Sequence, residues 1–251
     1  MADLDMAVTT LNRSGRGCEG ASSWIGDLAD SATLAGLPEF DVVVFTTAPP
    51  GRDDAAYRLA YTDGPGRVLD ALPSLPDRLV LTSTTGVYGV NDGSWVDESS
   101  PTEPTRSSAV VVVEGERRLQ AAGPTVVVRP AGIYGPGRNR LLARVAAGEE
   151  AVSTDGTPRW TNRIHRDDVV AALLVAATHP SAPPALIAVD NEPSPRDDVI
   201  RYLADRLGGP EPATVDVSSP TGKRCHNGAL TALGWTPQYP TYREGYAALT
   251  P

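Results

Sequence analysis

Hydroxyl side chains that could take part in chemistry gather in one stretch of this 251-residue sequence, residues 81–89. There an expected strand runs into Thr84 and then into Tyr88, within a Val-Tyr-Gly sequence. A threonine hydroxyl can polarise a carbonyl group, and such a hydrogen bond is worth about two orders of magnitude in rate. An unassisted phenol has a pKa near ~10, so Tyr88 would donate a proton more easily than accept one. The alternative is that Thr84 caps the strand end and Tyr88 packs beneath the site.

Composition limits the classes of partner. The formal net charge of −9 argues against nucleic acid and an anionic membrane surface. The longest apolar run, residues 169–177, is far too short to span a bilayer, and no signal segment is evident. Cys18 and Cys225 lie too far apart to suggest a disulfide framework or a metal site. We therefore expect a cytoplasmic protein with no metal and a small-molecule partner, with a homodimer as a further expected assembly.

Short β-branched runs alternate with longer helical stretches, as is typical of an α/β fold around a parallel sheet. The expected strands are residues 8–11, 23–25, 42–45, 79–82, 125–128 and 185–189. The expected helices are residues 53–72, 108–122, 141–147, 167–177 and 196–207. Gly64-Pro65-Gly66 should kink or split the first helix. Valine runs at residues 42–44 and 126–128 show no alternation, which indicates strands covered on both faces.

Three further motifs accompany the hydroxyl stretch. Gly26-Asp27-Leu28 follows a strand, the segment 129–138 follows another, and Ile164-His165-Arg166-Asp167-Asp168 opens a helix. In this order and spacing the chain resembles the extended short-chain dehydrogenase/reductases of the NAD-dependent epimerase/dehydratase family. Residues 222–227, 233–235 and 239–246 resemble an atypical subgroup. The resemblance covers about residues 8–249 and implies a Rossmann-like doubly wound parallel sheet, truncated at its N-terminus, with a small C-terminal cap.

The resemblance also implies contacts for a nicotinamide cofactor. Arg13 matches the position that binds the 2′-phosphate of NADP, which favours NADP over NAD. A solvated arginine with no ligand is an equal alternative. Asp27 matches the acid on the adenine side. The other expected contacts, at the carboxyl ends of later strands, are Thr46, Thr47, Ala48, Arg129, Pro130 and Ile133.

Catalytic and substrate residues follow from the same comparison. Thr84 matches the catalytic hydroxyl, whereas Tyr134, Arg138 and Arg166 could face a substrate or make structural contacts. The family's Tyr-x-x-x-Lys pair, in which the ammonium lowers the phenol pKa, does not occur in this sequence.

The only lysine is Lys223, and the residue four positions before it is Ser219. When Glu116 is aligned with the family's glutamate, Ser108 and Val112 take the places of the tyrosine and the lysine. Proton transfer would then fall to Thr84 or Tyr88.

No segment of the sequence matches the family's first strand, its glycine-rich turn and the helix N-terminus that holds the pyrophosphate. Residues 15–20 spell G-x-G-x-x-G, but only residues 21–25 separate them from the next corner, so we expect a surface loop there. The sheet should lack its middle strand. Either residues 7–11 pair directly with residues 42–45, or an open slot remains between them. Binding of NADP or NAD should therefore be weak or absent.

Three interpretations compete. In the first, the protein is an NAD(P)-dependent reductase or epimerase of the atypical subgroup, of unknown substrate, whose cofactor loop is encoded upstream of this sequence, so that the chain as it stands is impaired. In the second, it is a non-catalytic protein that binds a small ligand or partner. In the third, it is an inactive remnant. We favour the family-level oxidoreductase with impaired activity. A single Rossmann-like domain is expected, with residues 1–137 and 168–190 in the sheet core and residues 138–167 and 191–251 in the cap.

Overall fold

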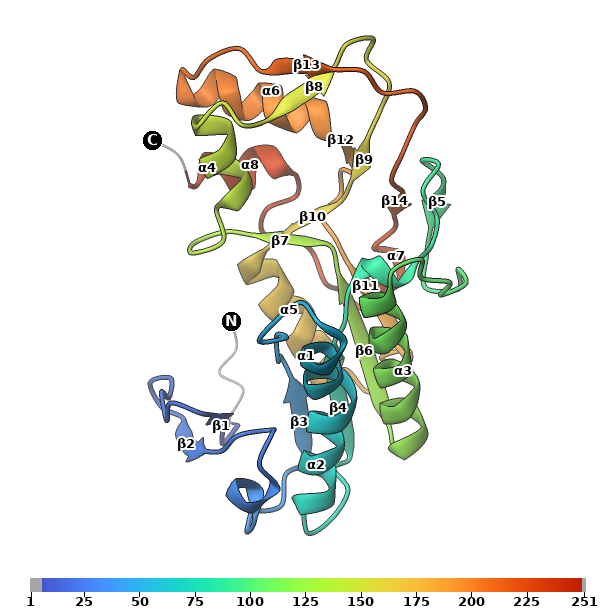
Figure 1. Ribbon diagram of the computed structural model, residues 1–251. Helices are drawn as coiled ribbons and strands as arrows, with labels where there is room; N and C mark the ends of the chain where they lie inside the picture. The colour runs from blue at the N-terminus through green and yellow to red at the C-terminus, as the bar shows by residue number, and fades with distance from the viewer. Residues whose placement is uncertain (1–5, 250–251) are drawn as a thin grey trace.

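The computed structural model describes residues 6–249, and its centre is a four-stranded parallel sheet (Figure 1). The strand order is β11-β6-β4-β3. The strands are β3 (Val42–Phe45), β4 (Arg78–Thr82), β6 (Thr125–Pro130) and β11 (Ala185–Ala188). Every residue of β6 is buried, as expected for a strand that is covered on both faces. The expected Rossmann-like α/β fold is confirmed.

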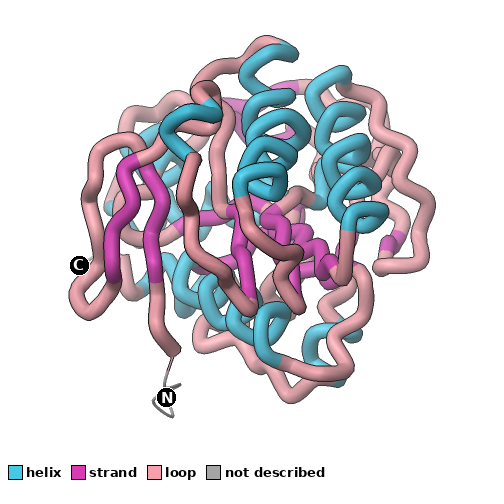
Figure 2. The backbone as a smooth tube through the Cα atoms, turned by 90° about the horizontal axis from the view of Figure 1, so that it is seen from below, coloured by secondary structure: helices cyan, strands magenta, loops and turns pink. Residues whose placement is uncertain are grey.

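Helices cover both faces of this sheet (Figure 2). Leu79 and Leu81 of β4 pack on one face with Val112 of α3 (Ser107–Ala122). Val80 points to the other face, where it packs with residues of α5 (Arg166–Thr178) and α7 (Gly228–Ala232). Side chains alternate along a strand, so β4 contributes to two separate hydrophobic clusters.

The first expected helix is continuous in the structure. It runs from α1 (Asp54–Arg58) through a π-helical turn, η2 (Leu59–Asp63), into α2 (Gly64–Ala71). Proline cannot donate the usual helical hydrogen bond and clashes with the preceding turn, and the wider π turn before Pro65 accommodates both effects. The predicted kink at this position is therefore a π turn rather than a break.

A gap in strand pairing separates the N-terminal strands from this sheet. Strands β1 (Thr9–Asn12) and β2 (Ser22–Ile25) form their own parallel pair, and among residues 6–249 neither pairs with β3. Of the two expected alternatives, the structure therefore shows the open slot between β1 and β3. Val44 of β3 is 40% exposed. The glycine-rich segment 15–20 lies in the loop between β1 and β2 and opens no helix, as expected.

The upper part of the molecule in Figure 1 is a cap of short elements. Its strands are β7 (Gly132–Tyr134), β8 (Ala151–Ser153), β9 (Trp160–Thr161), β10 (Arg163–His165), β12 (Ser194–Pro195) and β13 (Ala213–Val215). Its helices are α4 (Arg140–Ala146), α6 (Arg196–Leu207) and α8 (Tyr242–Ala247).

Two further connections tie the C-terminal segment to the sheet. Strand β14 (Arg224–Cys225) pairs with β5 (Trp95–Val96), and α7 packs against β11. Leu230 and Trp235 belong to the same hydrophobic cluster as Val80. Residues 228–235 therefore lie on the sheet, although the sequence placed the whole segment 191–251 in the cap.

Candidate active site

The carboxyl end of β4 positions the hydroxyl stretch. Thr84 is half-buried and caps the short 3₁₀ helix η3 (Thr85–Val87), because its Oγ1 accepts the N–H of Gly86 at 3.0 Å. Since that oxygen accepts from the backbone, its own proton is free for a further acceptor. Ser83, one residue earlier, is buried and donates to Glu116 of α3.

Tyr88 belongs to a buried polar network rather than to an open surface. It is 2% exposed, and Arg129 donates from Nη1 to its hydroxyl oxygen at 2.8 Å. Arg129 also makes two hydrogen bonds to Glu116, from Nη2 to Oε2 at 2.7 Å and from Nε to Oε1 at 3.1 Å. Burial raises the pKa of Tyr88 to about 12, although Arg129 acts in the opposite direction. The side chains expected to move a proton and to touch the cofactor, Tyr88 and Arg129, are thus paired with each other in the interior.

The expected cofactor contacts lie on both sides of the slot. Arg13 is exposed after β1, and Asp27 accepts the N–H of Ala29 at 2.9 Å in the corner after β2. Across the slot, at the end of β3, Thr46 and Ala48 are exposed and Thr47 donates to the carbonyl of Ala60 at 2.8 Å. Further along the sheet, Pro130 is buried and Ile133 is half-buried.

The residues expected to face a substrate separate into buried and exposed ones. Tyr134 is 3% exposed, stacks on Tyr246 with ring centres 4.4 Å apart, and meets His165 edge-on at 5.5 Å. Burial raises the pKa of Tyr134, so its phenol stays protonated at neutral pH. Arg138 and Arg166 are exposed, and Arg166 donates to the carbonyl of Pro136 at 2.9 Å. Tyr134 is therefore part of the cap packing, and only the two arginines reach solvent.

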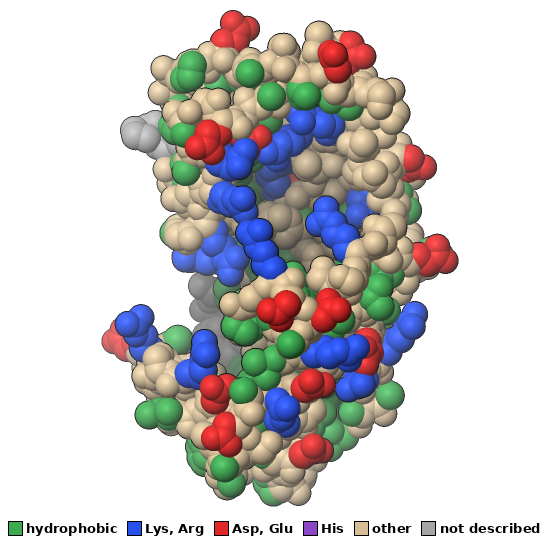
Figure 3. Space-filling view, in the orientation of Figure 1, with side chains coloured by type: hydrophobic (Ala, Val, Ile, Leu, Met, Phe, Trp, Pro, Cys, Tyr) green, Lys and Arg blue, Asp and Glu red, His purple; other side chains and the backbone are tan. Residues whose placement is uncertain are grey.

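A hollow between the cap and the sheet is surrounded by lysine and arginine side chains (Figure 3). In the cap, a pocket of about 380 Å³ is lined by Arg140, Leu141, Arg144, Glu150 and Arg196. Burial would raise the pKa of Glu150, but hydrogen bonds from Arg144 and Arg196 hold it below its usual value. Three cations around one carboxylate leave a net positive pocket, which suits an anionic group.

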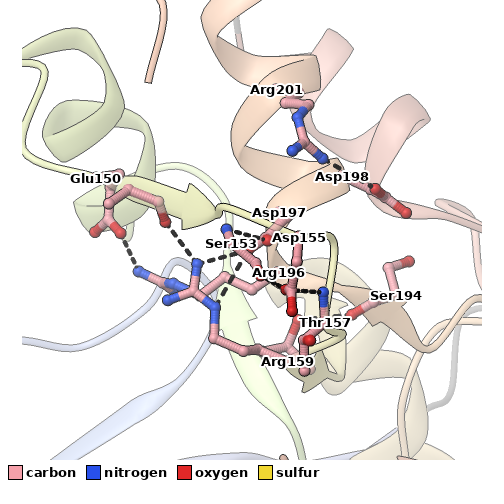
Figure 4. Close-up of polar contacts among 12 residues, drawn as sticks. Glu150, Ser153, Asp155, Thr157, Arg159, Ser194, Arg196, Asp197, Asp198 and Arg201 are labelled. Carbon is pink, nitrogen blue, oxygen red and sulfur yellow. Dashed lines mark hydrogen bonds and ion pairs between the residues drawn. The ribbon is translucent and has the colours of Figure 1, made fainter. Parts of the chain in front are cut away.

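A second ion pair fixes the cap elements beneath this pocket (Figure 4). Asp197 of α6 accepts the backbone N–H of Ser153 in β8 at 2.6 Å and pairs with Arg159 at 2.5 Å. The sequence alone did not predict Asp197 and its partners or the contact of Arg196 with Glu150, because these partners lie 38 to 46 residues apart and no local pattern links them.

Comparison with known proteins agrees with this fold. The NAD dependent epimerase/dehydratase family matches residues 3–189, and the chain belongs to this family. A 3-diazoavenalumate denitrifying reductase from Streptomyces sp is 28% identical over 247 residues, which cover 86% of this chain and 81% of the relative.

Solved structures show the same relationship. The solved structure of a putative NAD-dependent epimerase/dehydratase from Methylobacillus flagellatus has a chain that is 33% identical in sequence to this one. The two structures align with a TM-score of 0.81 over 96% of this chain and 88% of the other. MoeE5 in complex with UDP-glucuronic acid and NAD is 23% identical, with a TM-score of 0.74 over the same shares, and supports the fold alone.

The described part of the chain contains neither a candidate membrane span nor a candidate metal cluster. Among residues 6–249, no helix is both long and apolar enough to cross a membrane. Within the same range, no three His, Cys, Asp or Glu side chains are placed to hold a metal ion.

Proposed function

We propose that this protein is an NAD(P)H-dependent reductase of a small carbonyl compound that carries an anionic group. The observation that carries the proposal is the Thr84 hydroxyl, half-buried at the carboxyl end of β4, where open α/β sheets bind their ligands. Membership of the NAD dependent epimerase/dehydratase family and the reductase named among the relatives support oxidoreductase chemistry.

Thr84 is the group that we expect to touch the substrate. Its oxygen accepts from Gly86, so its proton can be donated to the carbonyl oxygen and draw electron density from the carbonyl carbon. Beneath it, Ser83, Tyr88, Arg129 and Glu116 hold the strand end in place. We assign Tyr88 to this support, because its phenol is buried and already bonded to Arg129.

Residues on the two sides of the slot suit a nicotinamide cofactor better than the slot itself does. Arg13 and Asp27 on one side of the slot, and Thr46 and Ala48 on the other, are accessible for the adenosine and nicotinamide halves. Among residues 6–249, no glycine turn opens a helix at the slot to bind the pyrophosphate, so weak binding is expected. When bound, the reduced nicotinamide would supply hydride to the substrate. Arg13 favours NADPH over NADH.

Calorimetric titration with NADPH and NADH tests the cofactor half of the proposal. We expect dissociation constants above the micromolar range, with NADPH the tighter ligand and an Arg13→Gln variant removing that preference. Micromolar binding of either nucleotide would contradict the expected weakness.

The arginine pocket is the basis for the expected anionic group. A screen of aldehydes and ketones at millimolar NADPH, in matched pairs with and without a carboxylate or phosphate, tests it. We expect turnover of the anionic members, and a KM about tenfold higher for them in Arg140→Gln, the cost of losing roughly one charged hydrogen bond. Arg201→Gln, an exposed arginine of α6 that lies 3.8 Å from Asp198, is the matched control. Ligand binding without any turnover would favour a binding protein instead.

A further inference from the structure

One ionisable side chain near the site has no partner in the networks described above. Lys223 is the only lysine in the sequence. It is half-buried, and no carboxylate or other acceptor for its ammonium lies among the contacts of residues 6–249. A partly buried lysine without a counter-ion is costly to keep charged, which is the usual condition of a lysine that exchanges its proton.

Asn162 anchors the backbone around Lys223 to the carboxyl end of β6. Its Nδ2 donates to the carbonyl of Lys223 at 2.9 Å, and its Oδ1 accepts the N–H of Cys225 at 2.8 Å. The carbonyl of Asn162 accepts the N–H of Gly132, the first residue of β7, at 3.2 Å. Gly132 lies two residues beyond Pro130, the last residue of β6, so these bonds bring Lys223 to the ligand-binding edge of the sheet.

We infer the side on which Lys223 lies from β14, the strand that it immediately precedes. Arg224 points away, since its guanidinium lies over Trp95 at 5.0 Å and over Trp160 at 4.7 Å. Successive side chains of an extended segment point to opposite sides, so Lys223 and Cys225 share the other face. Cys225 is 2% exposed and packs in the cluster that contains Val87 and Tyr88.

Burial, and not the neighbouring charges, favours loss of the Lys223 proton. Burial lowers the pKa of Lys223, and Arg106, the residue before α3, lowers it further, whereas the Cys225 thiol opposes both. Glu98 acts on Cys225 and Tyr88, and its carboxylate is bound to the N–H of Ile187 at 2.8 Å. Arg106 lies two residues before Ser108, the position that the resemblance aligns with the family's tyrosine.

We propose that the Lys223 ammonium donates the proton in the reduction, in place of Tyr88. This inference rests on the proposed function. When bound, NAD(P)H would supply the hydride that adds to the carbonyl carbon. The π electrons would move to oxygen, and that oxygen, hydrogen-bonded to Thr84, would take the proton from Nζ. The products are the alcohol, NAD(P)⁺ and a neutral amine, which takes a proton back from water.

The first test needs no turnover, because a single lysine can be observed alone. Reductive dimethylation with ¹³C-formaldehyde labels Lys223 and the N-terminal amine, and Lys223→Arg identifies the lysine signal by its loss. We expect the signal to titrate below the ordinary lysine pKa of about 10.4, and Arg106→Gln to move the titration upward. An ordinary titration, or a lysine too enclosed to react, would overturn the proposal.

The second test separates the lysine's charge from its proton. With any carbonyl compound that the wild-type protein reduces, Lys223→Met and Lys223→Arg should both lose about 100-fold in kcat, because arginine keeps the charge but does not release its proton. KM for Lys223→Arg should stay within about threefold. The wild-type kcat should fall as pH rises through the lysine pKa measured by NMR.

The outcomes are distinguishable. If the wild-type protein reduces no carbonyl compound, the proposed function fails and the lysine's role fails with it. If the wild type is active and either lysine variant keeps its kcat, only the role of Lys223 is overturned. Arg201→Gln again controls for the loss of one surface charge.

Discussion

At the scale of single residues, the structure divides the hydroxyl stretch into one accessible group and one buried group. Thr84 caps η3 with its oxygen and keeps a proton to donate, whereas the Tyr88 hydroxyl is bonded to Arg129 in the interior. Sequence order alone could not separate these roles, because both residues follow the same strand. Burial and pairing support the proposal that Thr84 contacts the substrate, and they place Tyr88 in the buried framework.

Substitution of the two hydroxyl residues tests this division. Thr84→Val should lower kcat about 100-fold, whereas Tyr88→Phe should leave it within a few-fold and cost about 1 kcal/mol of stability. Thr84→Ser keeps both the hydroxyl and the cap and is the matched control. Steady-state kinetics measures kcat, and urea unfolding measures the free energy of unfolding. A fall in kcat for Tyr88→Phe as large as that for Thr84→Val would show that the Tyr88 phenol takes part in the reaction.

A buried carboxyl at the junction of cap and sheet should make stability depend on pH. Burial raises the pKa of Asp190 to about 7, against opposing effects of the Glu192 N–H and Arg163. A raised acid pKa stabilises the fold fully below about pH 4, and this contribution is lost as pH rises through 7. Urea unfolding at pH 5 and pH 8 should show a loss of at most about 3 kcal/mol that Asp190→Asn removes. Asp198→Asn, at an exposed position of α6, should keep the wild-type dependence.

At the scale of elements, one buried ion pair joins β4, α3 and β6. Glu116 of α3 receives two bonds from Arg129 of β6 and one from Ser83 beyond β4, and its side chain is 3% exposed. Removal of one partner leaves a buried charge without compensation, which typically costs 3–5 kcal/mol, roughly. We therefore expect Glu116 to anchor the end of β4 to α3 and β6.

Substitution of two neighbouring glutamates tests whether the buried Glu116–Arg129 pair stabilises the fold. Glu116→Ala should lower the free energy of unfolding by about 4 kcal/mol. Glu114→Ala, two residues away on the exposed side of α3 where it pairs with Arg58 and Arg118, should cost less than about 1 kcal/mol. Urea unfolding of both variants would show the contrast, and equal losses would mean that the buried pair is not the anchor.

The elements differ in how well the sequence predicts them. The sheet strands and long helices lie within two residues of their expected bounds, because apolar runs and cap residues mark them locally. The cap strands are two or three residues long and carry no periodic signal, so they were missed. Arg129 was expected at the cofactor because it lies near the end of a strand. Its partner Glu116 comes from a helix, and such a pairing depends on packing that no local pattern encodes.

At the scale of the whole molecule, two parallel sheets lie side by side without joining. Among residues 6–249, β1 pairs only with β2, and the edge of β3 away from β4 has no strand partner. At an unpaired strand edge the backbone N–H and C=O groups form hydrogen bonds with water, and such an edge can pair with another strand. The same gap explains the expected weakness of cofactor binding, because the pyrophosphate cradle of this fold belongs there.

Hydrogen exchange along β3 gives a test of the gap. The N–H of Arg78 bonds to the carbonyl of Asp41, so in the alternating pattern of a parallel ladder Val43 faces β4 while Val42 and Val44 face the gap. The Val44 amide should therefore exchange at least about tenfold faster than that of Val43, as measured by NMR. Equal protection at both positions would show that the slot is closed in solution. Protection of Val44 that increases with protein concentration would show that a strand from a second copy closes it.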